Sequence, residues 1–294
     1  MRNPGVSIII PTYKRAGIIN KAINSVLEQT HSNWELIIVD NFSNDGTKEL
    51  ISKLNDKRIK FFEIKNNGVI GKSRNFGIKN SNFSIIAFLD SDDYWLSNKL
   101  EESLNYIEKG YDLVYHDLFI LKNNRKSICK KKLGSFKIEK PVFYNLIKLG
   151  NPIACSSVVV KANLLNETKG FSENIELITS EDYDLWIRIS RLTNKFKFID
   201  KTLGFYKIDD NESGNPELSY RSLRAIYNIH LKENIKTLPV WFLYMKARYL
   251  YQLNENKDSF LILKSLLITK TSIQIKIKTF YMFFSLLFKL NKIS

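Results

Sequence analysis

Four short runs rich in β-branched residues, separated by segments with helical spacing, restrict the fold available to the first third of the chain. The runs cover residues 6–10, 34–39, 59–62 and 85–89. Between the first two, apolar residues recur at helical spacing: Ile18, Ala22, Ile23, Val26 and Leu27. A strand, a helix and a second strand form a crossover that makes the two strands parallel and buried. The pattern predicts an α/β fold, with a Rossmann-like, mostly parallel central sheet flanked by helices.

Polar residues follow three of these predicted strands. In such sheets ligands bind beyond the carboxyl ends of the strands. Asp40 ends a buried run, and its carboxylate can accept two hydrogen bonds from the edge of a uracil ring or from a ribose diol. Each segment taken alone could also be a strand stop, a turn or a helix cap. The candidate nucleotide-binding residues at this edge are Pro11, Thr12, Tyr13, Arg15, Asp40, Asn41, Ser43, Asp90 and Ser91.

A cluster of acidic residues follows the fourth run. Asp90, Asp92 and Asp93 lie within four positions and repel one another unless a cation is bound among them. The first hypothesis is therefore a metal site. The alternative is that these residues cap the next helix, because Asp and Ser favour that position.

Two cations lie near the start of the helix expected at residues 71–79. Lys72 and Arg74 could bind a diphosphate there, or they could form a solvated basic face. The chain has neither a Walker pattern nor a glycine-rich dinucleotide fingerprint.

Three ordered motifs carry a resemblance to a known family. The run VSIIIPTYKRAGIINKAINSVLEQTHSNWELIIVDNFSNDGT, then GKSRNFGIKN and then FLDSDDYW resemble the family 2 glycosyltransferases over residues 5–210. The resemblance implies a GT-A fold and a nucleotide-sugar donor. It places the nucleotide at Asp40 and in the pocket lined by residues 11–13. It also implies Mn²⁺ or Mg²⁺ at Asp92, with Asp90 contacting the donor or serving as a second ligand.

A second acidic motif, EDYDLWIR, begins at Glu181. On a helix, Asp182 shares a face with Leu185, Trp186, Ile189 and Leu192, whereas Asp184 shares the opposite face with Arg188 and Arg191. We therefore expect Asp182 to point inward. The motif resembles the family's ED motif, which implies that Asp182 is the general base, with Glu181 as the alternative.

Three further features concern the metal and the acceptor. Where many relatives have Tyr-Arg-x-His, this chain has Asp209 in place of the histidine, which makes Asp209 a candidate metal ligand. The resemblance also makes Ser156 and Ser157, on an expected strand at 154–160, and Trp186 candidate acceptor contacts, although the two serines fit a core role equally well. The chain lacks the Gln-x-x-Arg-Trp pattern of processive synthases, so transfer of a single sugar is expected.

The C-terminal part differs in charge from the rest. The chain carries a net charge of +15, and residues 215–294 hold thirteen Lys or Arg against four Asp or Glu. Helices are expected at 220–234, 240–253 and 259–268, while residues 273–278 alternate like a strand. The apolar stretch 279–288 is too short to span a bilayer, and lysines flank it. It could lie on the anionic inner face of the cytoplasmic membrane or pack against the catalytic domain or a second subunit.

The expected organisation is a catalytic domain at 1–214 and a basic, apolar helical extension at 215–294. Within the first, residues 1–93 form the nucleotide-sugar half and 94–214 the acceptor half. Two unpatterned cysteines, Cys129 and Cys155, are expected to be buried thiols, which suits a reducing compartment. No signal peptide is expected from the short run at 6–10, so the protein is expected in the cytoplasm, peripheral to the membrane.

The expected function is a metal-dependent, inverting glycosyltransferase. It would move one hexose or N-acetylhexosamine from a UDP-sugar to a glycan acceptor, expected to be lipid-linked, in surface-polysaccharide synthesis. One alternative is a catalytically silent relative that acts as a scaffold at the membrane, and a weaker one is a nucleotidyltransferase. A homodimer is compatible with the sequence. Nucleic acid is not an expected partner because no recognition motif accompanies the positive charge.

Overall fold

The computed structural model describes residues 3–122, 131–208 and 214–290. The chain forms two compact units. The first comprises residues 1–143, 151–174 and 181–209, and the second comprises 144–150, 175–180 and 210–294. The division expected at residue 214 stays a prediction. The two units differ from it in that two short segments before that residue group with the C-terminal helices.

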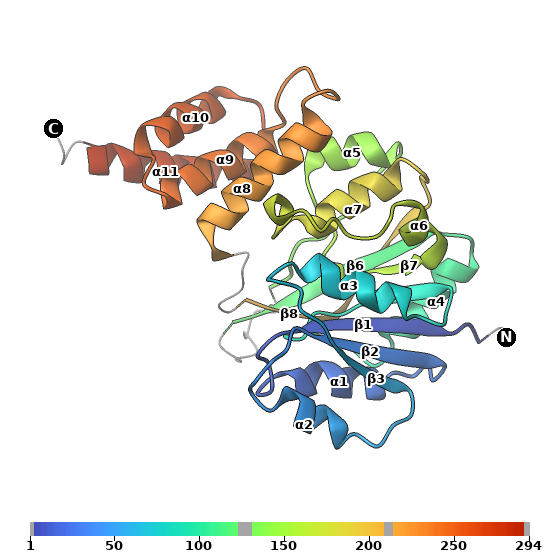
Figure 1. Ribbon diagram of the computed structural model, residues 1–294. Coiled ribbons are helices and arrows are strands. Elements are labelled where there is room, and N and C mark those ends of the chain that lie inside the picture. The colour runs from blue at the N-terminus through green and yellow to red at the C-terminus, as the bar shows by residue number, and fades with distance from the viewer. Residues whose placement is uncertain (1–2, 123–130, 209–213, 291–294) are drawn as a thin grey trace. The chain divides into compact units, whose positions relative to one another are not determined.

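The four predicted strands form one half of the sheet, as Figure 1 shows. Strands β1 and β2 are entirely buried, which is why their sequences are almost continuously apolar. The pairs β3–β2, β2–β1 and β1–β4 are all parallel. The prediction of a parallel sheet is confirmed here. The strands are β1 (Val6–Thr12), β2 (Trp34–Asp40), β3 (Ile59–Glu63) and β4 (Ile85–Phe88).

The other half of the sheet is mixed. Strand β7 runs antiparallel to both β4 and β6, while β6 and β8 are parallel to each other. The short β5 pairs antiparallel with β8. In the described residues the order is β3-β2-β1-β4-β7-β6-β8-β5. The strands of this half are β5 (Tyr94–Trp95), β6 (Leu113–Leu121), β7 (Val159–Lys161) and β8 (Phe196–Lys207).

Helices cover both faces of the parallel half. Alternate residues of β1, such as Ile8 and Ile10, join a core cluster with residues of α1, α2 and α4. On the other face, Gly77 of α3 lies directly against Ile9, where a Cβ atom would come within 2.5 Å of the Ile9 side chain. The helices of this unit are α1 (Ile19–Leu27), α2 (Thr47–Ser52), α3 (Ile70–Lys79), α4 (Lys99–Glu108), α6 (Ala162–Glu167) and α7 (Glu181–Ser190).

The strand expected at 154–160 is wrong in its first half. Cys155–Ser157 is a 3-10 helical turn, and the strand begins only at Val159. The hydroxyl of Ser157 donates to the carbonyl of Ala154 (2.7 Å), a local bond that competes with strand pairing. Cys155 is buried as expected, whereas Cys129 lies outside the described residues.

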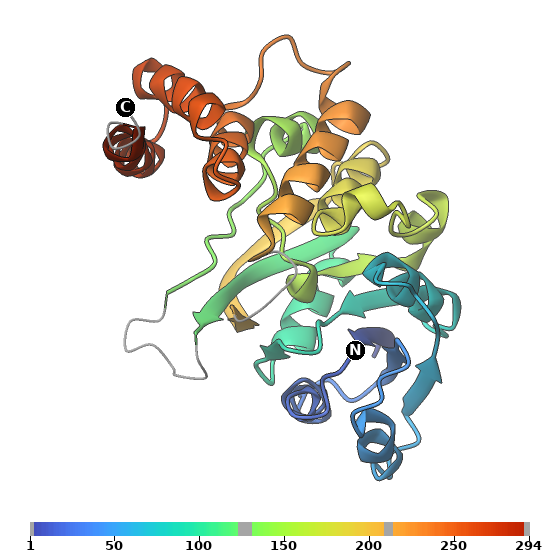
Figure 2. The same cartoon turned by 60° about the vertical axis from the view of Figure 1, so that its left-hand side comes forward.

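The second unit is helical, and its C-terminal helices are orange to red in Figure 2. Ala247, Leu263 and Leu286 form its core, one from each of α9, α10 and α11. Residues 273–278, whose alternation made a helix less certain in the sequence, open helix α11, as the expected helical extension requires. The helix expected at 220–234 ends earlier and continues as a π-helical turn, Tyr227–Leu231. The helices are α5 (Val142–Leu149), which begins in the first unit, α8 (Pro216–Ile226), α9 (Val240–Gln252), α10 (Asn256–Ile268) and α11 (Ile273–Leu290).

Candidate active site

The carboxyl ends of β1 and β2 bring two of the predicted segments together. Thr12 pairs in register with Asp40, and the amide of Asn41 donates to the carbonyl of Thr12 (3.0 Å). The side-chain oxygen of Asn41 in turn accepts from the amide of Asn66 (2.9 Å). Parallel strands therefore place these loops side by side at one edge of the sheet.

Asp40 is buried and holds its own loop. Its two carboxylate oxygens accept from the hydroxyl (2.5 Å) and the amide (2.7 Å) of Ser43. Burial raises the pKa of Asp40, and these two bonds oppose that shift. The Ser43 oxygen also accepts from the amide of Lys14 (2.7 Å), so Ser43 ties the loop after β2 to the loop after β1.

Two aromatic side chains project from this edge. Tyr13 and Phe42 are each about half exposed, at 49% and 51%. Phe42 has a φ of +52°, a conformation that costs a bulky residue roughly 1–2 kcal/mol. Exposed ring faces beside Asp40 are suited to stacking on a planar ligand. Phe42 was not among the predicted site residues, although an aromatic residue inside a polar turn is an available signal.

The three acids of the cluster after β4 each have a different partner. Asp90 pairs with Arg74 (2.7 Å), and Asp92 lies 3.8 Å from the guanidinium of Arg15. Asp93 is buried and accepts from the amide of Lys207 (3.0 Å). It does not begin a helix, because β5 follows it at once. The alternative of a simple helix cap is thus wrong for Asp93.

Like charges and burial oppose the ionisation of this cluster. Burial raises the pKa of Asp92, and the charge of Asp90 raises it further. Ser91 is buried between them. Among the described residues no three His, Cys, Asp or Glu side chains converge tightly enough to hold a metal by themselves. The candidate ligand Asp209 lies outside the described residues.

Arg74 links this cluster to α7. Its guanidinium is buried and donates to Glu181 (2.6 Å) and to Asp90 (2.7 Å). The reading of Arg74 as part of a solvated basic face is therefore wrong, whereas Lys72 is half-buried. Because two carboxylates occupy the guanidinium, contact between Arg74 and a diphosphate stays a prediction.

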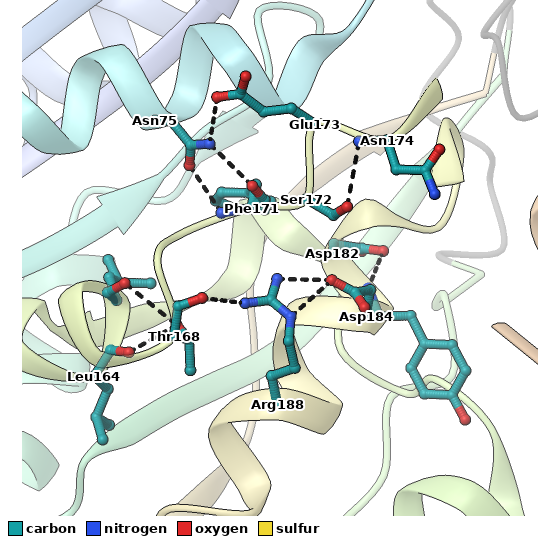
Figure 3. A network of polar contacts seen from close by, with 12 residues as sticks. Asn75, Leu164, Thr168, Phe171, Ser172, Glu173, Asn174, Asp182, Asp184 and Arg188 are labelled. Carbon is teal, nitrogen blue, oxygen red and sulfur yellow. Dashed lines mark hydrogen bonds and ion pairs between the residues drawn. The ribbon is translucent and has the colours of Figure 1, made fainter. Parts of the chain in front are cut away.

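The acids of α7 are arranged differently from the expectation. Asp184 is almost fully buried, and Asp182 is half-buried, so the outward placement of Asp184 was wrong. Arg188 explains the difference. Its guanidinium donates twice to one oxygen of Asp184 (2.6 and 2.9 Å) and once to the carbonyl of Thr168 (2.6 Å), as Figure 3 shows.

Asp182 has the environment of a proton acceptor. Burial and then the charge of Glu181 raise its pKa to about 7. One carboxylate oxygen accepts from the amide of Tyr183 (2.6 Å), and the Asn151 amide lies 3.5 Å from both oxygens. A pKa near the working pH is the best value for a general base. Asn151 was not a predicted site residue, because it lies thirty-one positions from Asp182 in the chain.

The loop before α7 is anchored on α3, as the upper part of Figure 3 shows. The Asn75 side chain accepts from the amide of Phe171 (2.8 Å) and donates to its carbonyl (2.9 Å) and to Glu173 (3.0 Å). Gly71 allows the close approach, because a Cβ there would lie 2.6 Å from the carbonyl oxygen of Ser172.

Replacing Gly71 with Ala is therefore expected to lower the free energy of unfolding by roughly 1–3 kcal/mol, because backbone must move to admit the methyl group. Urea denaturation measures the change. Gly17→Ala is the matched control, since a Cβ at Gly17 meets nothing within 4 Å. Equal stability of the two variants would show that the loop does not depend on this contact.

The expected acceptor residues are all buried. Ser156, Ser157 and Trp186 are each at most 1% exposed. The Ser156 hydroxyl accepts from the amide of Asp90 (3.0 Å), and Trp186 packs edge-on against Phe171. In this structure the three side chains are packed in the interior next to the candidate site. Their direct contact with an acceptor stays a prediction.

Comparisons with known proteins converge on one family. The sequence model "Glycosyl transferase family 2" matches residues 7–157. The Escherichia coli protein named UDP-Glc:alpha-D-GlcNAc-diphosphoundecaprenol beta-1,3-glucosyltransferase WfgD is 36% identical over 64% of this chain and 71% of its own length. An uncharacterized glycosyltransferase of Rickettsia felis is 39% identical over 69% of this chain but only 33% of its own length. Residues 1–349 of TarS from S. aureus, solved with UDP-GlcNAc, share the fold at a TM-score of 0.63 and 20% identity, covering 89% of this chain and 80% of that one.

Proposed function

Because the chain belongs to glycosyltransferase family 2, we propose that this glycosyltransferase moves one sugar from a UDP-sugar to a lipid-linked glycan acceptor. The sugar would be a hexose or N-acetylhexosamine, and the pathway would be surface-polysaccharide synthesis. The activity stated in the name of the E. coli relative supports the UDP donor and the diphospholipid acceptor. The chain spans only a third of the Rickettsia felis relative, so the activity of the whole protein rests on this proposal.

One observation carries the proposal. Arg74 bridges Asp90, in the motif that follows β4, and Glu181, the neighbour of Asp182. The candidate base and the candidate donor site are therefore held by one buried cation inside one compact unit. A single-sugar transferase needs this juxtaposition, because the acceptor hydroxyl must reach the anomeric carbon of the bound donor.

The proposed reaction is a single displacement. Asp182 accepts the proton of the acceptor hydroxyl as its oxygen bonds to the anomeric carbon. The bond from that carbon to the diphosphate breaks on the opposite face, and UDP leaves with the electron pair. Attack opposite to the leaving group inverts the configuration of the sugar. Glu181 is the alternative base, although its carboxylate is engaged by Arg74.

The donor would lie at the carboxyl edge of the sheet. The exposed ring of Tyr13 would contact the nucleobase, together with Asp40 and Asn41. The loop residues Pro11, Thr12 and Ser43 would shape this pocket. Arg15 and Lys72 are the cations proposed for the diphosphate.

The acidic cluster fits a divalent cation. Asp92 would hold Mn²⁺ or Mg²⁺ because its own ionisation is opposed by burial and by Asp90, and a cation relieves both. Asp90 and Asp209 are the candidate further ligands. When bound, the ion supplies neutralisation of the charge on the departing diphosphate.

Replacing Asp92 with Asn is expected to lower metal-dependent turnover by about 100-fold or more, because it removes the proposed ligand. UDP release from a panel of UDP-sugars, with a diphospholipid-linked acceptor, measures the effect, and a chelator should reproduce it in the wild type. Glu108→Gln, an exposed acid at the end of α4, is the control. Full activity in the chelator would exclude the metal.

The same assay tests the proposal against its alternatives. Release of pyrophosphate would indicate a nucleotidyltransferase. No product from any donor would favour a silent scaffold subunit. A lipid-linked acceptor would place the protein at the inner face of the cytoplasmic membrane, and a homodimer stays a prediction. No helix in the described residues is long and apolar enough to cross a bilayer.

A further inference from the structure

Helix α11 presents an apolar stripe to solvent. Ile273, Ile277, Phe280, Tyr281 and Phe284 are between 39% and 72% exposed. At 3.6 residues per turn these positions cover an arc of about 100° along one side of the helix. Five large apolar side chains on one exposed arc are unusual for a soluble surface, where such residues occur singly. This set of five is called the outer stripe below.

The opposite side of α11 is held by its own unit. Leu286 is buried against Ala247 and Leu263, with Met282 packed beside them. Phe283 stacks on Phe260 of α10, with ring centroids 4.7 Å apart. The core contacts of the unit are therefore satisfied from the other face of the helix, and the outer stripe is not needed to build that core.

The outer stripe is continuous. The rings of Phe280 and Phe284 lie 4.3 Å apart, and Tyr281 lies 6.5 Å from Phe280. At the end of α10, five positions before Ile273, Ile268 is 89% exposed. Aromatic side chains of this kind favour the boundary between lipid and water.

The charge around the outer stripe is of one sign. From residue 259 to the end of the chain there are six lysines and no acidic residue. Lys276 and Lys278 flank the stripe on opposite sides of the helix, and Lys270 lies in the turn before it. The ammonium of Lys276 donates to the carbonyl of Leu267, whereas Lys270 and Lys278 are exposed. An anionic surface complements this arrangement.

We infer that the outer stripe of α11 lies in the interfacial layer of an anionic membrane. Its apolar side chains would enter the acyl boundary, and Lys270 and Lys278 would contact lipid phosphate groups. The inference deepens the proposed function, since a lipid-linked acceptor is presented at such a surface. Lipid is the occupant that fits, because an anionic membrane presents an apolar acyl boundary to the aromatic side chains and phosphate groups to the lysines.

Flotation of the full chain on vesicles tests the inference. Wild type is expected to bind phosphatidylcholine vesicles that contain phosphatidylglycerol at least about tenfold more tightly than phosphatidylcholine alone, and salt should weaken binding. Phe280→Ser with Phe284→Ser should reduce binding to the anionic vesicles by at least about tenfold. Lys270→Gln with Lys278→Gln should do so by about tenfold.

Matched controls separate the surface from general effects. Leu27→Ser with Leu192→Ser changes two equally exposed apolar residues of the first unit, and Lys53→Gln with Lys57→Gln changes two exposed lysines there. Both should bind like the wild type. Circular dichroism and the melting temperature check that each variant is folded. The substituted side chains are exposed, so their replacement should leave the fold intact.

Three results would overturn the inference. The first is equal binding of the wild type to the two kinds of vesicle. The second is unchanged binding of the phenylalanine variant to anionic vesicles. The third is that this variant loses a dimer in sedimentation without losing vesicle binding. The last would assign the stripe to a second copy of the chain. UDP release without vesicles should be unchanged in the phenylalanine variant. A wild type that binds anionic vesicles but releases no UDP from any donor would contradict the proposed function and leave this inference standing.

Discussion

Replacing Asp182 with Asn is expected to lower turnover by about 10²–10⁴-fold, the range for loss of a general base. Asparagine has nearly the same shape and can keep the contact with the Tyr183 amide only through its oxygen, but it cannot accept a proton from the acceptor. The Michaelis constant for the donor should change little, because the proposed partner of Asp182 is the acceptor hydroxyl. Steady-state assays of UDP release measure both quantities.

Glu181→Gln is the matched variant for this experiment. If Asp182 is the base, Glu181→Gln retains much more activity than Asp182→Asn. The opposite order would assign the base to Glu181. Thermal unfolding of both proteins is needed, because Glu181 also contributes to the buried bridge with Arg74.

The pH dependence provides an independent check. Since the pKa of Asp182 is about 7, kcat/KM should rise with pH and level off above that value, as the carboxylate ionises. Removing the charge of Glu181 should move this rise to lower pH.

In the unfolded chain the Asp182 carboxyl titrates near its ordinary pKa of 3.8, so the folded state holds the proton more tightly. The free energy of unfolding should therefore fall as pH rises from about 4 to 7. The Asp182→Asn variant should lack this part of the pH dependence.

Replacing Arg74 with Met is expected to destabilise the protein by roughly 3–5 kcal/mol, the cost of leaving a buried charge without its partner. Glu181 is buried, and Arg74 is the cation that neutralises it and Asp90 together. The variant should also lose activity, because the bridge positions the residue next to Asp182. Chemical denaturation measures the stability, and UDP release measures the activity.

Lys72→Met is the control for Arg74→Met. It removes a cation from the same helix at a half-buried position, and its effect on stability should stay within about 0.5 kcal/mol. A double-mutant cycle with Glu181→Gln sharpens the test. The double variant should be more stable than the sum of the single changes predicts, by roughly 0.5–3 kcal/mol. Simple additivity would contradict the bridge.

The parallel half of the sheet could be predicted from the sequence because its signal is local. Strands that are buried on both faces consist of nearly continuous apolar residues, and the runs at 6–10 and 34–39 have this composition. The convergence of Thr12 and Asp40 then follows from the parallel register. Confirmation of the mixed sheet with flanking helices came from the structure and its neighbours.

The errors arose where tertiary contacts override a local pattern. Helical spacing placed Asp184 on a different face from the apolar stripe, but Arg188 on that same face neutralises it and allows burial. The strand-like alternation of residues 273–278 made a helix less certain there, yet they open α11 because that helix packs through Leu286. Ser156 and Ser157 were placed on a strand, but their hydroxyls bond to backbone groups. Spacing does place Asp184 and Arg188 on one helix face, but it does not reveal the contact of Arg188 with Thr168, the packing of Leu286 or the bond between Ser156 and Asp90.

The pairing of β4 has a consequence for the order in which this protein can fold during synthesis. One edge of β4 pairs with β1, which precedes it, but the other pairs with β7, which is made only at residues 159–161. Arg74 likewise meets Glu181 from 107 positions further along. A nascent chain that has reached residue 93 therefore has an open sheet edge and a cation without one of its partners. The first 93 residues and the later strands and helices of the first unit are thus parts of one cooperative unit, completed only when the ribosome has passed α7.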